Sequence, residues 1–342
     1  MDSEFLRSLA RHWHRTFDWR AIESRLNRYE HFHAVRGPDS IHFVRIRGTG
    51  PRPVPIILTH GWPSTFAELL QLGSRLAAPA SCGADQADSF DVVIPSLPGF
   101  AYSSKPNHPG TNMLTIADDW SELMTTLGYS QFVAHGGDLG AGVSTALGLR
   151  HSQRLHAIHL NYVPASYQPP PDRSGNLSAE ESAYFERRAA WTEAEGGYSH
   201  VQATKPDVLA PALNDSPMGL AAWIVDKFRS WSDCHGDVLS RFTVDELLTT
   251  ISIYWFTQCM PSAIRLYWEG RRQPLAFPSG TRVNVPVAVA HFPRELPIPP
   301  RSYVERGYDV RRWTEMPRGG HFAAMEEPDL LADDIRRFVR DL

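Results

Sequence analysis

Asp138 lies in a glycine-rich turn, Gly136-Gly137-Asp138-Leu139-Gly140, between the apolar run 132–134 and a segment of small residues at 141–146. This context is typical of a strand-turn-helix nucleophile elbow, in which the reactive residue has a strained backbone and side chains two residues away would collide. The free N–H groups and the dipole of the following helix would keep the carboxylate ionised. Asp138 is therefore a candidate nucleophile, although Asp is also a favoured helix N-cap residue.

A carboxylate at the nucleophile position restricts the reaction. Serine attacking a saturated carbon would leave an ether that water cannot readily cleave, whereas Asp leaves an ester whose acyl carbon water can attack. The expected substrates are therefore electrophilic saturated carbons that bear a leaving group, chiefly epoxides or alkyl halides.

The base for cleavage of such an ester is predicted at His321, on a glycine-rich turn after the last predicted strand and before the final helix. Two carboxylates compete to orient it. Glu295 lies at the carboxyl end of a predicted strand, where the active-site groups of parallel sheets collect, while Asp309 would lie at the opposite end of the sheet. We therefore predict that Glu295 orients His321. Glu326 and Glu327 are interpreted as first-turn helix charges, which the helix dipole favours.

The backbone amides of Trp62 and Leu139 are the predicted oxyanion hole. His60-Gly61-Trp62-Pro63 follows a predicted strand at the loop that normally donates one of these N–H groups, and the residue after the nucleophile donates the other. Water attack on the ester would place the developing charge on an oxygen of Asp138, so the hole serves the second half-reaction. The indole of Trp62 is predicted to line the substrate pocket, with a buried packing role as the alternative.

The candidate residues must be positioned by strands and helices, and short apolar runs alternate with helical patterns along the chain. A hairpin is predicted from runs at 31–36 and 41–47 around the turn Gly37-Pro38-Asp39-Ser40. Buried strands are predicted at 54–58, 90–94, 132–134, 155–160, 287–290 and 313–316, and helices at 64–78, 114–127 and about 330–339. This alternation predicts an α/β fold with a mostly parallel central sheet flanked by helices.

A helical insertion is predicted between the two parts of this sheet. From Pro164 and the Pro169-Pro170-Pro171 run to about residue 280 the apolar spacing is helical. We therefore divide the chain into an N-terminal helical or meander segment at 1–30, a first core part at 31–163, a helical cap at 164–282 and a second core part at 283–342.

Composition argues against several kinds of partner. The chain has 342 residues, of which 42% are hydrophobic and 21% charged, and its net charge of −4 gives no excess of cations for nucleic acid or an anionic membrane. Cys82, Cys234 and Cys259 are too few and too widely spread for a disulfide framework or a zinc site, which predicts free thiols.

There is no secretory signal and no spanning stretch of roughly 18 apolar residues, which predicts a cytoplasmic protein. No ligand cluster or nucleotide fingerprint is visible, so we expect no metal or organic cofactor.

The motifs described above resemble those of the microsomal-type epoxide hydrolases, which belong to the α/β-hydrolase superfamily, and of their soluble bacterial and fungal relatives and the insect juvenile-hormone hydrolases. The likeness runs over nearly the whole chain. The motifs that carry it are Phe17-Asp18-Trp19-Arg20, His60-Gly61-Trp62-Pro63, Gly136-Gly137-Asp138-Leu139-Gly140, Gln202-Ala203-Thr204-Lys205-Pro206-Asp207, Leu213-Asn214-Asp215-Ser216-Pro217 and the segment 318–328.

The resemblance implies that two cap tyrosines, Tyr198 and Tyr267, hold the epoxide oxygen. A phenol with a pKa of about 10 is well suited to protonate the alkoxide that ring opening releases. The resemblance also favours Glu295 as the acid. Unlike the membrane-bound members, the sequence lacks the N-terminal anchor helix and most of the long extension, from which we expect solubility and an altered cover over the substrate tunnel.

The sequence therefore predicts an epoxide hydrolase that converts a small epoxide and water to a vicinal diol through a covalent Asp138 ester. A haloalkane or haloacid-type dehalogenase is the nearest alternative, but it needs halide-binding donors such as a Trp beside the nucleophile, where Leu139 stands. A catalytically silent hydrolase fold that binds a small molecule is the other alternative. The sequence leaves the oligomeric state open, with a homodimer as one candidate.

Overall fold

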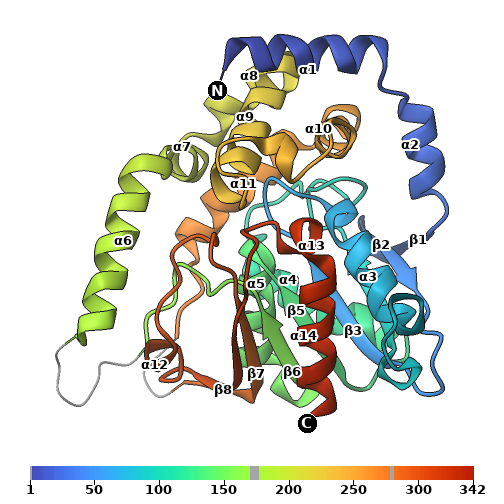
Figure 1. Cartoon of the computed structure of the whole chain (residues 1–342), viewed down its shortest axis with the longest axis vertical. Coiled ribbons are helices and arrows are strands. Elements are labelled where there is room, and N and C mark those ends of the chain that lie inside the picture. Colours follow the sequence, from blue (N-terminus) through green and yellow to red (C-terminus); the bar gives the residue numbers. More distant parts are fainter. Residues whose placement is uncertain (1, 170–176, 278–280) are drawn as a thin grey trace.

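A single mixed sheet runs through the centre of the molecule in a computed structural model that describes residues 2–169, 177–277 and 281–342 (Figure 1). Its strand order is β1-β2-β4-β3-β5-β6-β7-β8, and every neighbouring pair is parallel except β1 with β2 and β2 with β4. The strands are β1 (Glu30–Arg36), β2 (Asp39–Ile46), β3 (Val54–Thr59), β4 (Phe90–Pro95), β5 (Phe132–Gly136), β6 (Leu155–Leu160), β7 (Val283–His291) and β8 (Tyr308–Glu315). The predicted mostly parallel sheet is confirmed.

The strand bounds differ from the prediction where proline or charge interrupts the apolar pattern. The hairpin turn is only Gly37-Pro38, because Asp39 already pairs with Arg36. β7 begins at Val283, before Pro286, and its pairing with β8 shifts register at this proline, which cannot donate to the ladder. β8 begins at Tyr308, earlier than the predicted run at 313–316. It is an edge strand that carries charged residues, and a search for apolar runs does not detect such residues.

Helices cover both faces of the sheet, and successive strand residues supply the two cores. On one face lie α4 (Met113–Thr126) and α5 (Asp138–Arg150), and on the other lie α3 (Leu70–Ala77) and α14 (Pro328–Arg340) (Figure 1). Side chains of a strand alternate between faces. Ile57, Val93 and Ala134 accordingly belong to the first core, and Ile56, Val92 and Val133 to the second.

Between β6 and β7 the described residues contain helices and no strand. These helices are α6 (Ala179–Glu195), α7 (Gly197–Thr204), α8 (Pro206–Asp215), α9 (Pro217–Trp231), α10 (Val244–Thr257) and α11 (Met260–Arg272). Helices α8 to α11 gather at the upper end of the sheet, while α6 runs down its side (Figure 1). Pro170 and Pro171 lie outside the described residues, and the bounds of a separate cap domain stay a prediction.

The N-terminal helices α1 (Ser3–Arg15) and α2 (Trp19–Leu26) connect the cap to the core. Asp2 and Asp18 cap them with their side chains. Trp13 Nε1 of α1 donates to Ser252 Oγ of α10 at 3.1 Å, whereas Ile22 and Leu26 of α2 pack in the core cluster that contains α3 and α14. The remaining short elements are η1 (Phe66–Leu69), η2 (Pro79–Cys82), η3 (Gln86–Asp88), η4 (Ser152–Arg154), η5 (Val238–Ser240), α12 (Arg301–Val304) and α13 (Ala323–Glu326).

All three cysteines are free thiols, as predicted: Cys82 is exposed, and Cys234 and Cys259 are buried. Within the described ranges, no helix combines the length and the apolar character needed to cross a membrane.

Candidate active site

The turn at Asp138 has the strained geometry of a nucleophile elbow. β5 ends at Gly136 and α5 begins at Asp138, whose φ is +46°, in the left-handed region that L side chains rarely adopt. Such a conformation costs about 1–3 kcal/mol and persists only where the surroundings hold it. Here the turn packs tightly: a Cβ on Gly140 would meet the carbonyl group of Thr59, and one on Gly61 would meet the Asp138 side chain.

The two carboxylate oxygens of Asp138 have different partners. The backbone N–H of Trp62 donates to Oδ1 at 2.8 Å, and Nε2 of His321 lies 3.4 Å from Oδ2. The amide of Leu139 belongs to the first turn of α5, where N–H groups lack helical acceptors. The Asp138 carboxylate therefore lies between an N–H donor from the loop after β3 and the first turn of α5.

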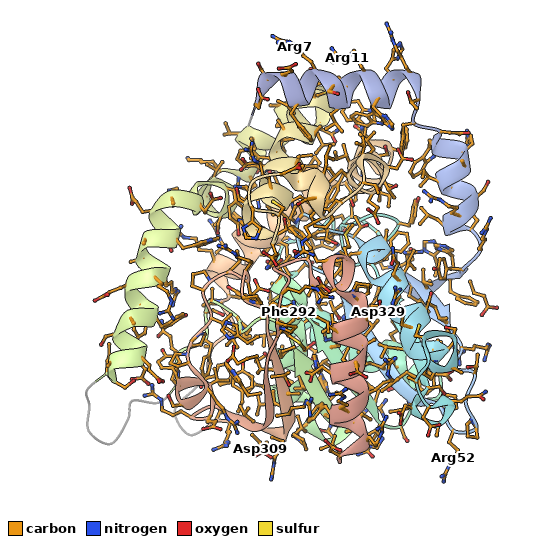
Figure 2. The ribbon with its side chains drawn as sticks, viewed as in Figure 1. Arg7, Arg11, Arg52, Phe292, Asp309 and Asp329 are labelled. Carbon is orange, nitrogen blue, oxygen red and sulfur yellow. The ribbon has the colours of Figure 1, made fainter. Side chains whose placement is uncertain are left out.

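Glu295, rather than Asp309, lies beside the imidazole. His321 Nδ1 is 2.5 Å from Glu295 Oε1, and the Glu295 side chain is completely buried. The amide of Leu296 donates to the same oxygen at 2.7 Å, which fixes the carboxylate. Asp309 instead accepts from Arg311, and it lies at the end of the sheet opposite Phe292 (Figure 2). The structure thus brings Asp138, His321 and Glu295 together in one chain of contacts.

Opposing effects act on the charge of His321. Burial disfavours the imidazolium, but the carboxylates of Glu295 and Asp138 outweigh burial and hold the pKa of His321 well above its usual value. Neutralising either carboxylate would therefore lower that pKa.

A small cavity of about 20 Å³ lies beside the nucleophile, large enough for one water molecule. Asp138, His321, Trp62, Asn161 and Glu68 are among its lining residues. Burial raises the pKa of Glu68 to about 7, while a hydrogen bond from Ser64 lowers it. Sequence reasoning missed both Glu68 and Asn161. Asn161 directly follows the end of a predicted strand, which was an available signal, whereas Glu68 lies five residues beyond Pro63 and gives no distinctive signal.

Two tyrosines from the cap helices face the same region. Tyr198 of α7 and Tyr267 of α11 have ring centroids 5.9 Å apart at an interplanar angle of 78°. The Trp62 indole stacks on Tyr198 at 5.1 Å and meets Tyr267 edge-on at 5.9 Å. Trp62 therefore both packs against the tyrosines and lines the small cavity.

Both phenols are held in the protonated form. Burial and then the negative charge of Asp138 raise the pKa of Tyr198, although its hydrogen bond with Tyr267 lowers it. Burial, then Tyr198 and Asp138, raise the pKa of Tyr267 well above its usual value. A phenol that stays protonated at neutral pH is available as a proton donor.

The interpretation of Glu326 and Glu327 as simple helix charges is incomplete. Glu326 accepts from the amide of Asp233, just after α9, at 2.7 Å and from the amide of Phe322 at 3.1 Å. Glu327 is buried and pairs with Arg241 and Arg318. These carboxylates tie the cap to the loop that carries His321, and short-range sequence patterns cannot show such contacts.

A third tyrosine near the base was also missed. Tyr162 follows β6, is buried, and lies edge-on to His321 at 6.0 Å between ring centroids. Burial, followed by the charges of Glu295 and Asp138, raises its pKa well above the usual value. One tyrosine after a strand gives no distinctive sequence signal.

The fold and the site together define an α/β-hydrolase with a carboxylate at the nucleophile position. Residues 54–224 match the family model for the alpha/beta hydrolase fold, and residues 1–69 match the model described as epoxide hydrolase N terminus.

Relatives and solved structures agree with these matches. Epoxide hydrolase 1 of Sus scrofa is 34% identical over 99% of this chain and 80% of its own length, and a Stigmatella aurantiaca protein is 41% identical over 98% and 76%. The juvenile hormone epoxide hydrolase structure from the silkworm Bombyx mori matches with a TM-score of 0.89 and 28% identity, covering 100% of this chain and 85% of that one. The Aspergillus niger epoxide hydrolase structure matches with a TM-score of 0.84 and 29% identity, covering 100% and 86%.

The chain belongs to the epoxide hydrolase family. It is therefore a hydrolase whose substrate is a small-molecule epoxide, as the sequence predicted. These matches do not favour the two alternatives, a dehalogenase and a silent binding fold.

Proposed function

We propose that the enzyme opens its epoxide through an ester on Asp138 and releases a vicinal diol when water cleaves that ester. The observation that supports this most directly is the chain of contacts from Glu295 through His321 to Asp138, with Tyr198 and Tyr267 in the cap above it. No step requires a metal ion or an organic cofactor.

In the first step, Asp138 Oδ2 attacks one epoxide carbon, and the bond from that carbon to the ring oxygen breaks. The electron pair moves to the oxygen, which takes a proton from Tyr198 or Tyr267. Because both phenols are protonated and lie beside each other, they can hold the oxygen before the bond breaks and donate as its charge develops.

In the second step, a water molecule in the small cavity attacks the acyl carbon of the ester, and His321 takes its proton. The negative charge then develops on Asp138 Oδ1, which accepts from the amide of Trp62 in the resting enzyme, and this amide acts together with that of Leu139 as the oxyanion hole. Collapse of this intermediate breaks the bond between the acyl carbon and the diol oxygen, and that oxygen takes the proton of the new carboxylic acid, which leaves Asp138 as a carboxylate and releases the diol. The proton taken from water replaces the one given by the tyrosines, so the cycle balances as epoxide plus water to diol.

Ester formation also prepares the base. In the resting enzyme the Asp138 carboxylate helps to keep His321 protonated, and an imidazolium cannot accept a proton. The ester is neutral, so its formation removes one of the two charges that raise the pKa of His321. His321 thereby becomes a better base at the moment when water must be activated.

Mass spectrometry of a His321→Gln variant incubated with a panel of epoxides and alkyl halides tests this mechanism. The ester should accumulate, so the intact protein should gain the mass of one epoxide, located on the peptide that contains Asp138. A matched Asp138→Asn/His321→Gln double variant should gain nothing. Adducts from halides alone, or an epoxide adduct on any other residue, would contradict the proposal.

A cytoplasmic location is also part of our proposal, supported by the three free thiols, which suit a reducing compartment, and a homodimer is the candidate oligomeric state. Light scattering after gel filtration measures the oligomeric state directly.

A further inference from the structure

Lys227 is a buried cation whose ammonium group lies over the ring of Tyr198. It belongs to α9, and its side chain is only 7% exposed. Burying an ammonium group is costly unless other groups compensate for the lost water, so its surroundings indicate what holds it there.

Two carboxylates and two aromatic faces surround the ammonium group. Nζ is 2.7 Å from Asp226 Oδ2 and 3.4 Å from Glu195 Oε2, and these carboxylates are 40% and 29% exposed. The same nitrogen lies 5.2 Å from the ring centroid of Tyr198 and 5.5 Å from that of Trp231. Because both carboxylates are partly exposed, a lysine at the protein surface could also pair with them. The contacts that a buried lysine makes in addition are those with the two aromatic rings.

The position of Lys227 matters for the acidity of Tyr198. Burial, the charge of Asp138 and the charge of Glu195 all raise the pKa of Tyr198, which makes the phenol a weaker acid. Lys227 neutralises Glu195 and presents a positive charge to the ring face. Because the charge of a phenolate spreads into its ring, the attraction to Lys227 grows as the proton leaves.

We propose that Lys227 is a positioning residue that fixes the Tyr198 ring and strengthens this phenol as an acid during opening of the epoxide. The inference rests on the proposed role of Tyr198. It assigns a function to a buried charge that neither the nucleophile, the base nor the oxyanion hole uses.

A double-variant cycle tests the inference. All variants carry His321→Gln, so that the rate of ester formation on Asp138 with styrene oxide is read alone, from intact mass against time. Lys227→Met should slow ester formation roughly tenfold, as expected for loss of a desolvated cation–π contact, and Lys227→Arg should retain most of the rate. Lys205→Met is the matched control, because Lys205 is an exposed lysine at the end of the helix that carries Tyr198, and it should leave the rate unchanged.

The decisive comparison is made in a Tyr198→Phe background. There Lys227→Met should cause no further loss, because the hydroxyl through which Lys227 acts is gone. An equal loss with and without the hydroxyl, or no loss in either, would overturn the inference. Tyr198→Phe without any effect of its own would instead overturn the proposed role of Tyr198.

A second variant decides the question if Lys227→Met does not fold. Glu195→Gln removes the charge that Lys227 neutralises, so ester formation should stay the same or become faster. A slowing like that expected for Lys227→Met would contradict the inference, because it would show that the ion pair matters only for the packing of the cap.

Discussion

The chemistry at His321 depends on how many charged carboxylates it faces. In the resting enzyme it faces two, Glu295 at 2.5 Å and Asp138 at 3.4 Å, and together they outweigh the cost of burying an imidazolium. The imidazole ring is thus held between two carboxylates. In the proposed mechanism, His321 therefore becomes able to act as a base only after ester formation has removed the charge of Asp138.

Ester formation should therefore change the pH dependence of the enzyme. A raised pKa means that His321 binds its proton up to a higher pH in the resting state, and loss of the Asp138 charge lowers that pKa in the ester. We expect the rate of ester hydrolysis in single turnovers to rise with pH and to level off at a lower pH than the one at which His321 titrates in the free enzyme.

Stopped-flow measurements of single turnovers give the first quantity, and NMR titration of the His321 imidazole gives the second. Glu295→Gln serves as a comparison, because it should slow hydrolysis by about 10²–10⁴-fold by weakening the base. Equal pKa values in the free enzyme and the ester would show that Asp138 does not control the protonation of His321.

The candidate site residues predicted from the sequence lie in the loops that follow strand ends. Asp138, Glu295 and His321 follow β5, β7 and β8, and parallel strands bring these ends together whatever the details of packing. Glu68 could not be predicted in this way, because it resembles an ordinary polar residue of a helical turn. Burial raises its pKa to about 7, and this burial beside the small cavity at Asp138 arises only in the tertiary structure.

Among the elements, α13 and the loop before it connect the cap to His321. Glu326 accepts hydrogen bonds from one amide after cap helix α9 and one amide next to His321. The amide of His321 itself donates to the carbonyl group of Trp231, at the end of α9, at 2.9 Å. The cap and the loop that carries His321 are therefore joined by a backbone hydrogen bond and by the Glu326 carboxylate.

Glu326→Ala should destabilise the protein by about 1–3 kcal/mol, because it leaves buried amides without an acceptor. It should also slow ester hydrolysis more than ester formation, since the displaced loop carries the base. Asp329→Ala is the matched control: Asp329 is 71% exposed in the first turn of α14 and pairs with Arg75 at the surface (Figure 2). Its loss should cost at most about 1 kcal/mol. Urea unfolding and single-turnover kinetics measure both effects, and equal behaviour of the two variants would show that Glu326 is only a helix charge.

At the scale of the whole molecule, the N-terminal segment connects the cap with the sheet. α1 lies across the cap helices, and α2 leads from there to β1 at the edge of the sheet (Figure 1). Leu9 is buried in the larger core cluster together with residues of α9 and α10, while His12 Nε2 lies 2.9 Å from Asp245 Oδ1 of α10. The segment therefore restrains the helices that hold the cap over the site.

Leu9→Ala should release this restraint without disturbing the sheet. Removing a buried leucine costs about 2–5 kcal/mol, and here the loss falls on the contact between α1 and the cap. We expect faster amide hydrogen exchange in α9 and α10, with β3, β5 and β6 still protected. Arg7→Ala is the matched control, because Arg7 points away from the cap on the same helix (Figure 2) and its loss should change stability by less than about 0.5 kcal/mol. If exchange instead increased equally in the cap and the sheet, the N-terminal segment would be part of one cooperative unit rather than a restraint on the cap.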